Sequence, residues 1–290
     1  MDATDRWAAW LLEHRFGGDE QLRESMLSDL AVYRDRVLAG ARVSDGDVVL
    51  DVGCGDGLVG VGALDLVGAA GTVIFSDVSV ELLEQCRRVV DGIGQSSRAA
   101  FVHTGLPELT GIGSASVDVV TTRSVLIYVA DKAGSFASFH RVLRPGGRLS
   151  MFEPINSFGS PEPADYLFGL DVSGLEVLAD RVKSVYRCYQ PAGGPMVDFD
   201  ERDLVELAEA AGFGEVHLDY RVDIDREPVR MSWSTMLRYA PNPLVPPLRQ
   251  VLDEALIGIE RETLTERLRE QLDRGTTRRR FATAYLTAVR

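Results

Sequence analysis

The chain has 290 residues, of which 45% are hydrophobic and 26% charged, and its formal net charge is −13. This balance is typical of a globular protein and excludes an intrinsically disordered chain. Nucleic-acid binding needs a cationic surface, so the acidic balance disfavours DNA or RNA as the main partner.

The opening of the chain and its cysteines bear on location. The opening residues MDATDR are charged, and no apolar run reaches the length of a membrane span. We therefore expect neither a signal peptide nor a membrane partner. Only three cysteines occur, Cys54, Cys86 and Cys188, and none forms a CxxC pair. A disulfide framework or a structural zinc site is not expected, and we predict a cytoplasmic protein.

Residues 1–40 predict an N-terminal helical cap made of two helices. Apolar residues recur at helical spacing from Trp7 to His14 and again from Leu22 to Val37, with a glycine pair between the two runs.

Residues 41–153 alternate between short β-rich runs and helical stretches. This alternation predicts right-handed crossovers and a parallel sheet covered by helices on both faces. The expected strands are residues 47–51, 72–77, 100–103, 117–122 and 148–153.

The second half of the chain is less regular. Residues 154–200 are rich in Pro and Gly, and we expect an insertion that contributes to a substrate pocket. The segment 201–290 returns to the core, with a helix at 204–211 and strands at 215–223 and 281–289. Between these strands, residues from about 226 to 278 predict a helical lid. One lid helix is expected to open at Pro246-Pro247, and another at a capping box of Thr263 and Glu266.

The most informative segment is an apolar strand that ends in Asp51 and continues into Gly53, Gly55 and Gly57. Glycine permits a tight turn and a close approach of a ligand to the backbone, and the start of the next helix offers free N–H groups. The following strand ends in Asp77, whose carboxylate can accept hydrogen bonds from both ribose hydroxyls of an adenosine group.

Two cofactor classes compete for this turn. Gly55, Gly57 and Gly60 also match the GxGxxG pattern of dinucleotide-binding domains. A dinucleotide would place a pyrophosphate beside Asp51 and Asp56, which repel it. S-adenosylmethionine instead places a sulfonium and an ammonium group there, and both are attracted by carboxylates. Charge therefore favours S-adenosylmethionine as the cofactor.

Four segments in chain order resemble the class I S-adenosylmethionine-dependent methyltransferases of the small-molecule type. They are LDVGCGDG at 50–57, FSDVS at 75–79, VDVVTTRSVLIYV at 117–129 and HRVLRPGGRLSMFEP at 140–154. The resemblance covers roughly residues 45–155 and 200–290. It implies an α/β fold with a Rossmann-like, seven-stranded, mostly parallel sheet whose last strand is antiparallel, here with helical cap and lid insertions.

The resemblance also assigns cofactor-binding roles. Gly53, Gly55 and Gly57 would line the methionine part, with Asp51 near its amino group; Asp77 would hold the ribose, Val78 would pack on the adenine, and backbone carbonyls near Arg123 and Ser124 would complete the methionine site. Family members usually carry an Asp-Ala pair after the third strand, and this chain has Gly105 at the Asp position. Thr104 or a backbone carbonyl is then the expected partner of the adenine amino group.

Three residues are candidates for the chemistry, although transfer from a sulfonium depends on alignment more than on a fixed base. Glu153, at the end of the fifth predicted strand, is a base or hydrogen-bond acceptor, or alternatively a capping residue. Tyr128 faces the methyl group or is a packed aromatic residue. His14 is a base on a covering helix or a structural residue. The carboxylates are scattered, so no metal site is predicted.

These observations predict an enzyme that methylates a small, partly hydrophobic metabolite on oxygen, nitrogen or carbon. One alternative is an enzyme of the same fold with non-methylating chemistry, such as a cyclase. A non-catalytic binding module is the second alternative. The sequence leaves the substrate and the oligomeric state open.

Overall fold

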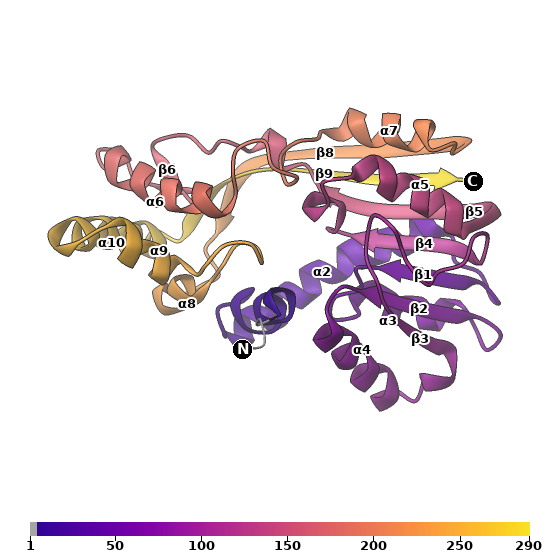
Figure 1. The fold of residues 1–290 in the computed structure, drawn as a ribbon. Coiled ribbons are helices and arrows are strands. Elements are labelled where there is room, and N and C mark those ends of the chain that lie inside the picture. Colours follow the sequence, from indigo (N-terminus) through magenta and orange to yellow (C-terminus); the bar gives the residue numbers. More distant parts are fainter. Residues whose placement is uncertain (1–4) are drawn as a thin grey trace. The chain divides into compact units, whose positions relative to one another are not determined.

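The computed structural model describes residues 5–290, so the first four residues of the charged opening lie outside the described part. The chain divides into two compact units (Figure 1). The sheet unit comprises Leu27–Ile155, Pro195–Arg221 and Thr283–Arg290. The helical unit comprises the residues up to Met26, Asn156–Gly194 and Val222–Ala282.

The sheet unit is built on a seven-stranded sheet in the order β3-β2-β1-β4-β5-β9-β8. Its strands are β1 (Val48–Val52), β2 (Thr72–Asp77), β3 (Ala99–His103), β4 (Val117–Arg123), β5 (Leu143–Pro154), β8 (Glu215–Pro228) and β9 (Thr276–Val289). The pairs β1–β2, β1–β4, β2–β3 and β4–β5 are parallel, whereas β9 runs antiparallel to β5. The predicted fold class is confirmed.

The strand order reverses between β1 and β4, since β2 and β3 follow on one side of β1 and β4 and β5 on the other. In the register of the sheet, Val52 pairs with both Ser76 and Thr122, and Asp77 pairs with His103. The carboxyl ends of four parallel strands therefore meet at one edge. Open α/β sheets bind ligands at such a reversal point.

Helices cover both faces of this sheet (Figure 1). On one face, α2 (Glu20–Ala41), α3 (Leu58–Leu66) and α4 (Val80–Gly92) contribute to a core with β1, β2 and β4. Its members include Val37, Ala63, Cys86, Phe75 and Val119, which are all fully buried. On the other face lie α5 (Lys132–Val142) and α7 (Glu201–Ala210), which pack against each other.

The helical unit has its own apolar core. Its elements are α1 (Arg6–Ala9), a π-helical turn η1 (Trp10–His14), the two-stranded sheet of β6 (Tyr166–Leu167) and β7 (Leu170–Asp171), α6 (Glu176–Tyr189), α8 (Trp233–Arg238), α9 (Leu248–Ala255) and α10 (Gly258–Asp273). Buried apolar residues from α6, α9 and α10 make up most of that core, among them Val182, Val251 and Leu268.

Two expectations about elements need correction. Residues 154–200 contain the fourteen-residue helix α6, although the sequence predicted no regular element there. The lid helix α10 begins at Gly258, and Thr263 lies inside it, where its hydroxyl donates to the carbonyl of Ile259. The capping box at Thr263 is therefore wrong. From Leu27 onward α2 belongs to the sheet unit, and the predicted cap boundary at residue 40 stays a prediction.

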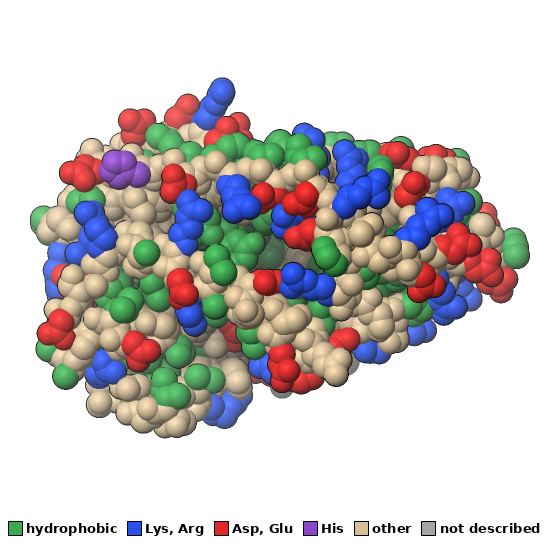
Figure 2. All heavy atoms as spheres, turned by 180° about the vertical axis from the view of Figure 1, so that it is seen from behind, with side chains coloured by type: hydrophobic (Ala, Val, Ile, Leu, Met, Phe, Trp, Pro, Cys, Tyr) green, Lys and Arg blue, Asp and Glu red, His purple; other side chains and the backbone are tan. Residues whose placement is uncertain are grey.

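The surface and the helices add two observations. On the face shown in Figure 2, cationic and anionic side chains are interspersed. Across residues 5–290, no helix combines the length and the apolar character that a membrane span requires.

Candidate cofactor site

The site begins with the glycine turn between β1 and α3. Gly53, Gly55 and Gly57 all have left-handed backbones, with φ of +64°, +56° and +90°. Side chains other than glycine rarely adopt this conformation. At Gly53 a Cβ would also lie 2.4 Å from Cγ2 of Val125. Glycine is therefore required at this position by the backbone and by a protein neighbour, independently of any ligand.

Asp51 connects the end of β1 to α3. Its carboxylate is 2% exposed, accepts the N–H of Gly60 at 2.8 Å and accepts the hydroxyl of Thr121 at 3.0 Å. Burial raises the pKa of Asp51 to about 7, and these hydrogen bonds together with the charge of Arg123 oppose the rise. Asp51 thus has protein partners that fix the turn, and its contact with the cofactor amino group stays a prediction.

Asp77 connects the end of β2 to the same turn. The carboxylate is 6% exposed, and one oxygen accepts the N–H of Gly55 at 2.9 Å. The other oxygen accepts the N–H of Ser79 at 2.9 Å. A carboxylate has about four acceptor positions, enough to hold the turn and a ribose hydroxyl together. This arrangement fits the ribose-binding role expected of Asp77.

The residues expected near the adenine gather around Val78, whose side chain is 51% exposed. The N–H of Thr104 donates to the carbonyl of Asp77 at 3.1 Å, and Nε2 of His103 lies 3.0 Å from the carbonyl of Val78. A Cβ at Gly105 would lie 2.3 Å from Cγ1 of Val78. The aspartate that the resemblance led us to expect at this position would therefore require Val78 to move, and glycine relieves the conflict.

Glu153 organises the loop after β4. It is fully buried, and its carboxylate accepts the N–H groups of Val125, Leu126 and Ile127 at 3.0, 2.9 and 3.3 Å. Burial raises the pKa of Glu153 to about 7, and the three N–H groups oppose the rise. These donors open the short 3-10 helix η3 (Leu126–Tyr128), so the geometry favours the capping alternative for Glu153 over the base.

Tyr128, Ser124 and Arg123 follow or end β4. Ser124 has a left-handed backbone with φ of +56°, and its N–H donates to the carbonyl of Phe152 at 2.8 Å. Tyr128 ends η3 and is partly exposed. Arg123 pairs with Phe152 in the sheet register. All three therefore lie at the edge of the sheet that carries the glycine turn.

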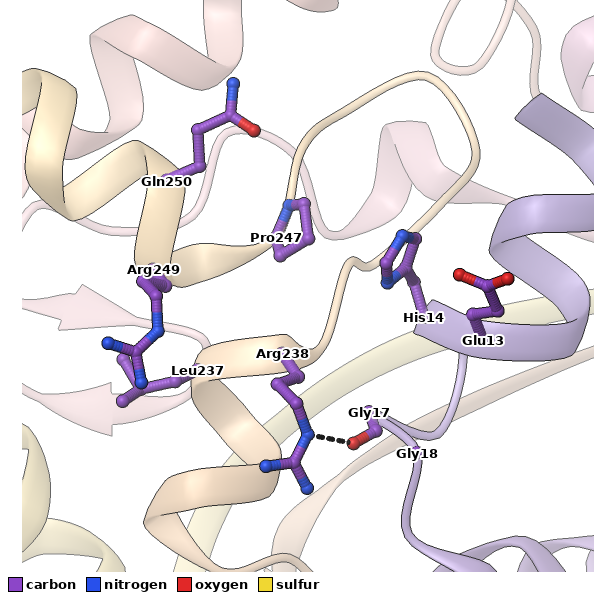
Figure 3. A pocket seen from close by; sticks show the side chains of 9 residues that line it. All are labelled: Glu13, His14, Gly17, Gly18, Leu237, Arg238, Pro247, Arg249 and Gln250. Carbon is purple, nitrogen blue, oxygen red and sulfur yellow. Dashed lines mark hydrogen bonds between the residues drawn. The ribbon is translucent and has the colours of Figure 1, made fainter. Parts of the chain in front are cut away.

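His14 lies in the helical unit, at the end of the π-helical turn η1. It lines a hollow of about 370 Å³ (Figure 3). The other lining residues are Glu13, Gly17, Gly18, Leu237, Arg238, Pro247, Arg249 and Gln250. Nε of Arg238 donates to the carbonyl of Gly17 at 2.6 Å and fixes one wall. The structure thus assigns His14 to a different unit from the glycine turn.

Sequence reasoning missed three residues of the cofactor site. The hydroxyl of Thr121 donates to Asp51, and alternation of side chains along a strand can indicate this contact. His103 contacts the carbonyl of Val78. Cys86, on α4, donates to the carbonyl of Gly55 at 3.1 Å, and no local pattern in the sequence predicts this contact. Among residues 5–290, no three His, Cys, Asp or Glu side chains group in a way that can hold a metal ion.

Comparison with known proteins shows which proteins the chain resembles. A family model described as a methyltransferase domain matches residues 49–147. A ubiquinone/menaquinone biosynthesis C-methyltransferase, UbiE, from Francisella philomiragia is 29% identical over 189 residues, which is 64% of this chain and 74% of that protein. Together with the fold, these matches support a class I S-adenosylmethionine-dependent methyltransferase. S-adenosylmethionine is accordingly the cofactor, and the turn, Asp77 and Val78 stay the residues predicted to bind it.

Other relatives of this methyltransferase chain are more distant or uncharacterised. An uncharacterised 37.1 kDa protein in transposon TN4556 of Streptomyces fradiae is 38% identical over 123 residues, and the match spans 42% of this chain but only 34% of that protein. A solved geranyl diphosphate methyltransferase in complex with S-adenosylmethionine superposes with a TM-score of 0.53 at 17% identity, covering 97% of this chain and 94% of that one. This second likeness shows the fold.

Proposed function

We propose that the chain transfers a methyl group from S-adenosylmethionine to a small, partly hydrophobic metabolite, with oxygen, nitrogen or carbon as the acceptor. The observation that carries the proposal is the hydrogen bond from the N–H of Gly55 to the carboxylate of Asp77, because it joins the expected ribose ligand to the turn expected to hold the methionine part. The name of the UbiE relatives, C-methyltransferases of quinone biosynthesis, supports carbon among the possible acceptors.

The cofactor, when bound, supplies an already activated methyl group. Asp77 would accept the ribose hydroxyls while it keeps the turn in place. Glu153 would hold the loop after β4 through three backbone N–H groups, so that the carbonyls near Arg123 and Ser124 stay in position. In this proposal the protein contributes alignment and exclusion of water rather than a strong base.

The acceptor site is the second part of the proposal. We infer that His14 contacts the acceptor, as a base or as a hydrogen-bond donor. His14→Asn is then expected to lower turnover and to leave adenosylhomocysteine affinity unchanged. His217→Asn is the matched control, because His217 is an exposed histidine on β8.

The reaction is tested with methyl-labelled S-adenosylmethionine and an extract of small, partly hydrophobic metabolites. Label is expected in a product other than the cofactor, and much less label is expected with the Asp77→Asn variant at a limiting concentration of S-adenosylmethionine. Conversion of a metabolite without label, by a protein that binds adenosylhomocysteine tightly, would establish the non-methylating alternative. Absence of any conversion across extracts, despite tight binding, would favour a binding module.

A further inference from the structure

Two buried thiols lie at the glycine turn, one within it and one in contact with it. Cys54 belongs to the turn, Cys86 belongs to α4, and their Sγ atoms are 3.9 Å apart. Cys54 is 6% exposed, Cys86 is fully buried, and both are free thiols. A disulfide has an S–S length of about 2.05 Å, so the two sulfur atoms need to approach by about 2 Å to form one.

These thiols share a neighbour with the ribose ligand. The S–H of Cys86 donates to the carbonyl of Gly55 at 3.1 Å, and Sγ of Cys54 lies 4.0 Å from the same oxygen. The N–H of Gly55 is held by Asp77 at 2.9 Å. Gly55 is thus held by the carboxylate of Asp77 through its N–H and by the thiol of Cys86 through its carbonyl.

We propose that Cys54 and Cys86 form a reversible disulfide under peroxide, and that this disulfide weakens cofactor binding. Cys54, the more exposed of the two, attacks one peroxide oxygen as its thiolate, which gives a sulfenic acid and releases hydroxide. Cys86 then attacks the Cys54 sulfur, the S–O bond breaks and water leaves. In sum, two thiols and one hydrogen peroxide give one disulfide and two waters, and a dithiol reverses the change by exchange.

The structure explains why the disulfide disturbs the site. Once Cys86 is oxidised it has no S–H, so the carbonyl of Gly55 loses its donor. Drawing the sulfurs together also moves Cys54, which is bonded covalently to Gly55. The hydrogen bond with Cys86 and burial raise the pKa of the Cys54 thiol, which keeps that thiol protonated and slow to oxidise at rest. Oxidation is therefore expected to be slow. It is expected to be slower still with cofactor bound, because a ligand on the turn restricts the movement that brings the two sulfurs together.

The test uses the full chain with the exposed Cys188 replaced by Ser, which leaves only the two buried thiols. After treatment with hydrogen peroxide, intact mass is expected to fall by about 2 Da and both titratable thiols to disappear. Adenosylhomocysteine affinity, measured by calorimetry, is expected to fall at least about tenfold and to recover with dithiothreitol. Adenosylhomocysteine added before the peroxide is expected to slow the loss of thiols.

The matched control is Cys86→Ser in the same background, because a serine hydroxyl can still donate to the carbonyl of Gly55 but cannot form a disulfide. Its affinity is expected not to change on peroxide treatment. The proposal is overturned if both thiols survive, if Cys54 gains oxygen atoms without a disulfide, if the disulfide leaves affinity unchanged, or if the serine variant loses affinity equally. A reduced protein that fails to bind adenosylhomocysteine would instead contradict the cofactor site itself.

Discussion

At the scale of single residues, Asp77 is the most direct test of the cofactor site. Asp77→Asn removes the charge and one acceptor oxygen while it keeps the size of the side chain. Hydrogen bonds to charged groups contribute about 1.5–3 kcal/mol each, so adenosylhomocysteine affinity is expected to fall about 100-fold. Calorimetry measures it, with Asp65→Asn on the exposed side of α3 as the control. Equal affinities of the two variants would remove Asp77 from the site.

Glu153 gives a prediction about pH. Its pKa is raised from 4.5 to about 7 in the folded chain, so the folded state binds the proton more strongly than the unfolded state does. Its contribution to the free energy of unfolding is therefore favourable at low pH and is lost as the pH rises from about 4.5 to 7. Glu153→Gln cannot ionise, so it lacks this loss.

The measurement is the difference in free energy of unfolding between Glu153→Gln and the unchanged protein, from urea titrations at several pH values. That difference is expected to shift in favour of the variant as the pH rises from 5 to 7, because only Glu153 can ionise. A cost independent of pH is expected as well, because the amide NH₂ of the variant faces a backbone N–H. A difference independent of pH would mean that Glu153 is ionised throughout.

At the scale of elements, the turn between β1 and α3 depends on its glycines in two separable ways. Gly53→Ala meets both the left-handed backbone and the methyl groups of Val125. We expect a loss of about 2–5 kcal/mol in unfolding free energy, from about 1–2 kcal/mol of strain and about 1–3 kcal/mol of overpacking. Gly94→Ala is the control, because its φ is +70° and nothing lies within 4 Å of the added Cβ.

A second change separates the two contributions. In a Val125→Ala background the steric conflict is relieved, so Gly53→Ala is expected to cost about as much as Gly94→Ala. Both costs come from chemical unfolding curves. If Gly53→Ala costs the same with and without Val125, the conflict is not what excludes a side chain from the turn.

The elements also show how far the sequence could predict the structure. The strand, glycine turn and helix at 48–66 were predictable, because apolar periodicity and glycine spacing are local signals. Helix α6 was missed, although Ala179, Val182 and Tyr186 recur at helical spacing, because the flanking Pro and Gly residues outweighed them. The start of α10 was misplaced because Ile257, before its first turn, offers no side-chain cap. The capping by Glu153 joins residues 26–28 positions apart, and no local pattern encodes it.

At the scale of the whole molecule, the cofactor residues and the helical core belong to different units. Leu268 is fully buried in the core of the helical unit, and Leu268→Ala is expected to cost about 2–5 kcal/mol. Hydrogen exchange is expected to become faster in α6, α9 and α10. Adenosylhomocysteine affinity is expected to change by about twofold at most, whereas a tenfold change would correspond to about 1.4 kcal/mol. Val177→Ala, 76% exposed on α6, is the control. A large loss of affinity in Leu268→Ala would mean that cofactor binding depends on this core.

The division into units also explains which parts of the site the sequence could not assign. The turn, Asp77 and Thr104 follow strands whose carboxyl ends meet in the sheet, so strand prediction alone brings them together. His14 lies in a segment that folds with residues 156–194 and 222–282, far away in the chain. Its surroundings depend on these distant segments, and no periodicity in the first forty residues encodes them.

One backbone contact has a consequence for how such a chain can diversify. The N–H of Val229 donates to the carbonyl of Gly275 at 2.9 Å, so the stretch from 229 to 275, with α8, α9 and α10, leaves and rejoins the protein at neighbouring points. A segment whose two ends lie side by side can be removed or exchanged without moving the backbone of the strands on either side. Recombination at these two positions can therefore replace three helices, in evolution or by design, and leave the glycine turn and the strands around it unchanged.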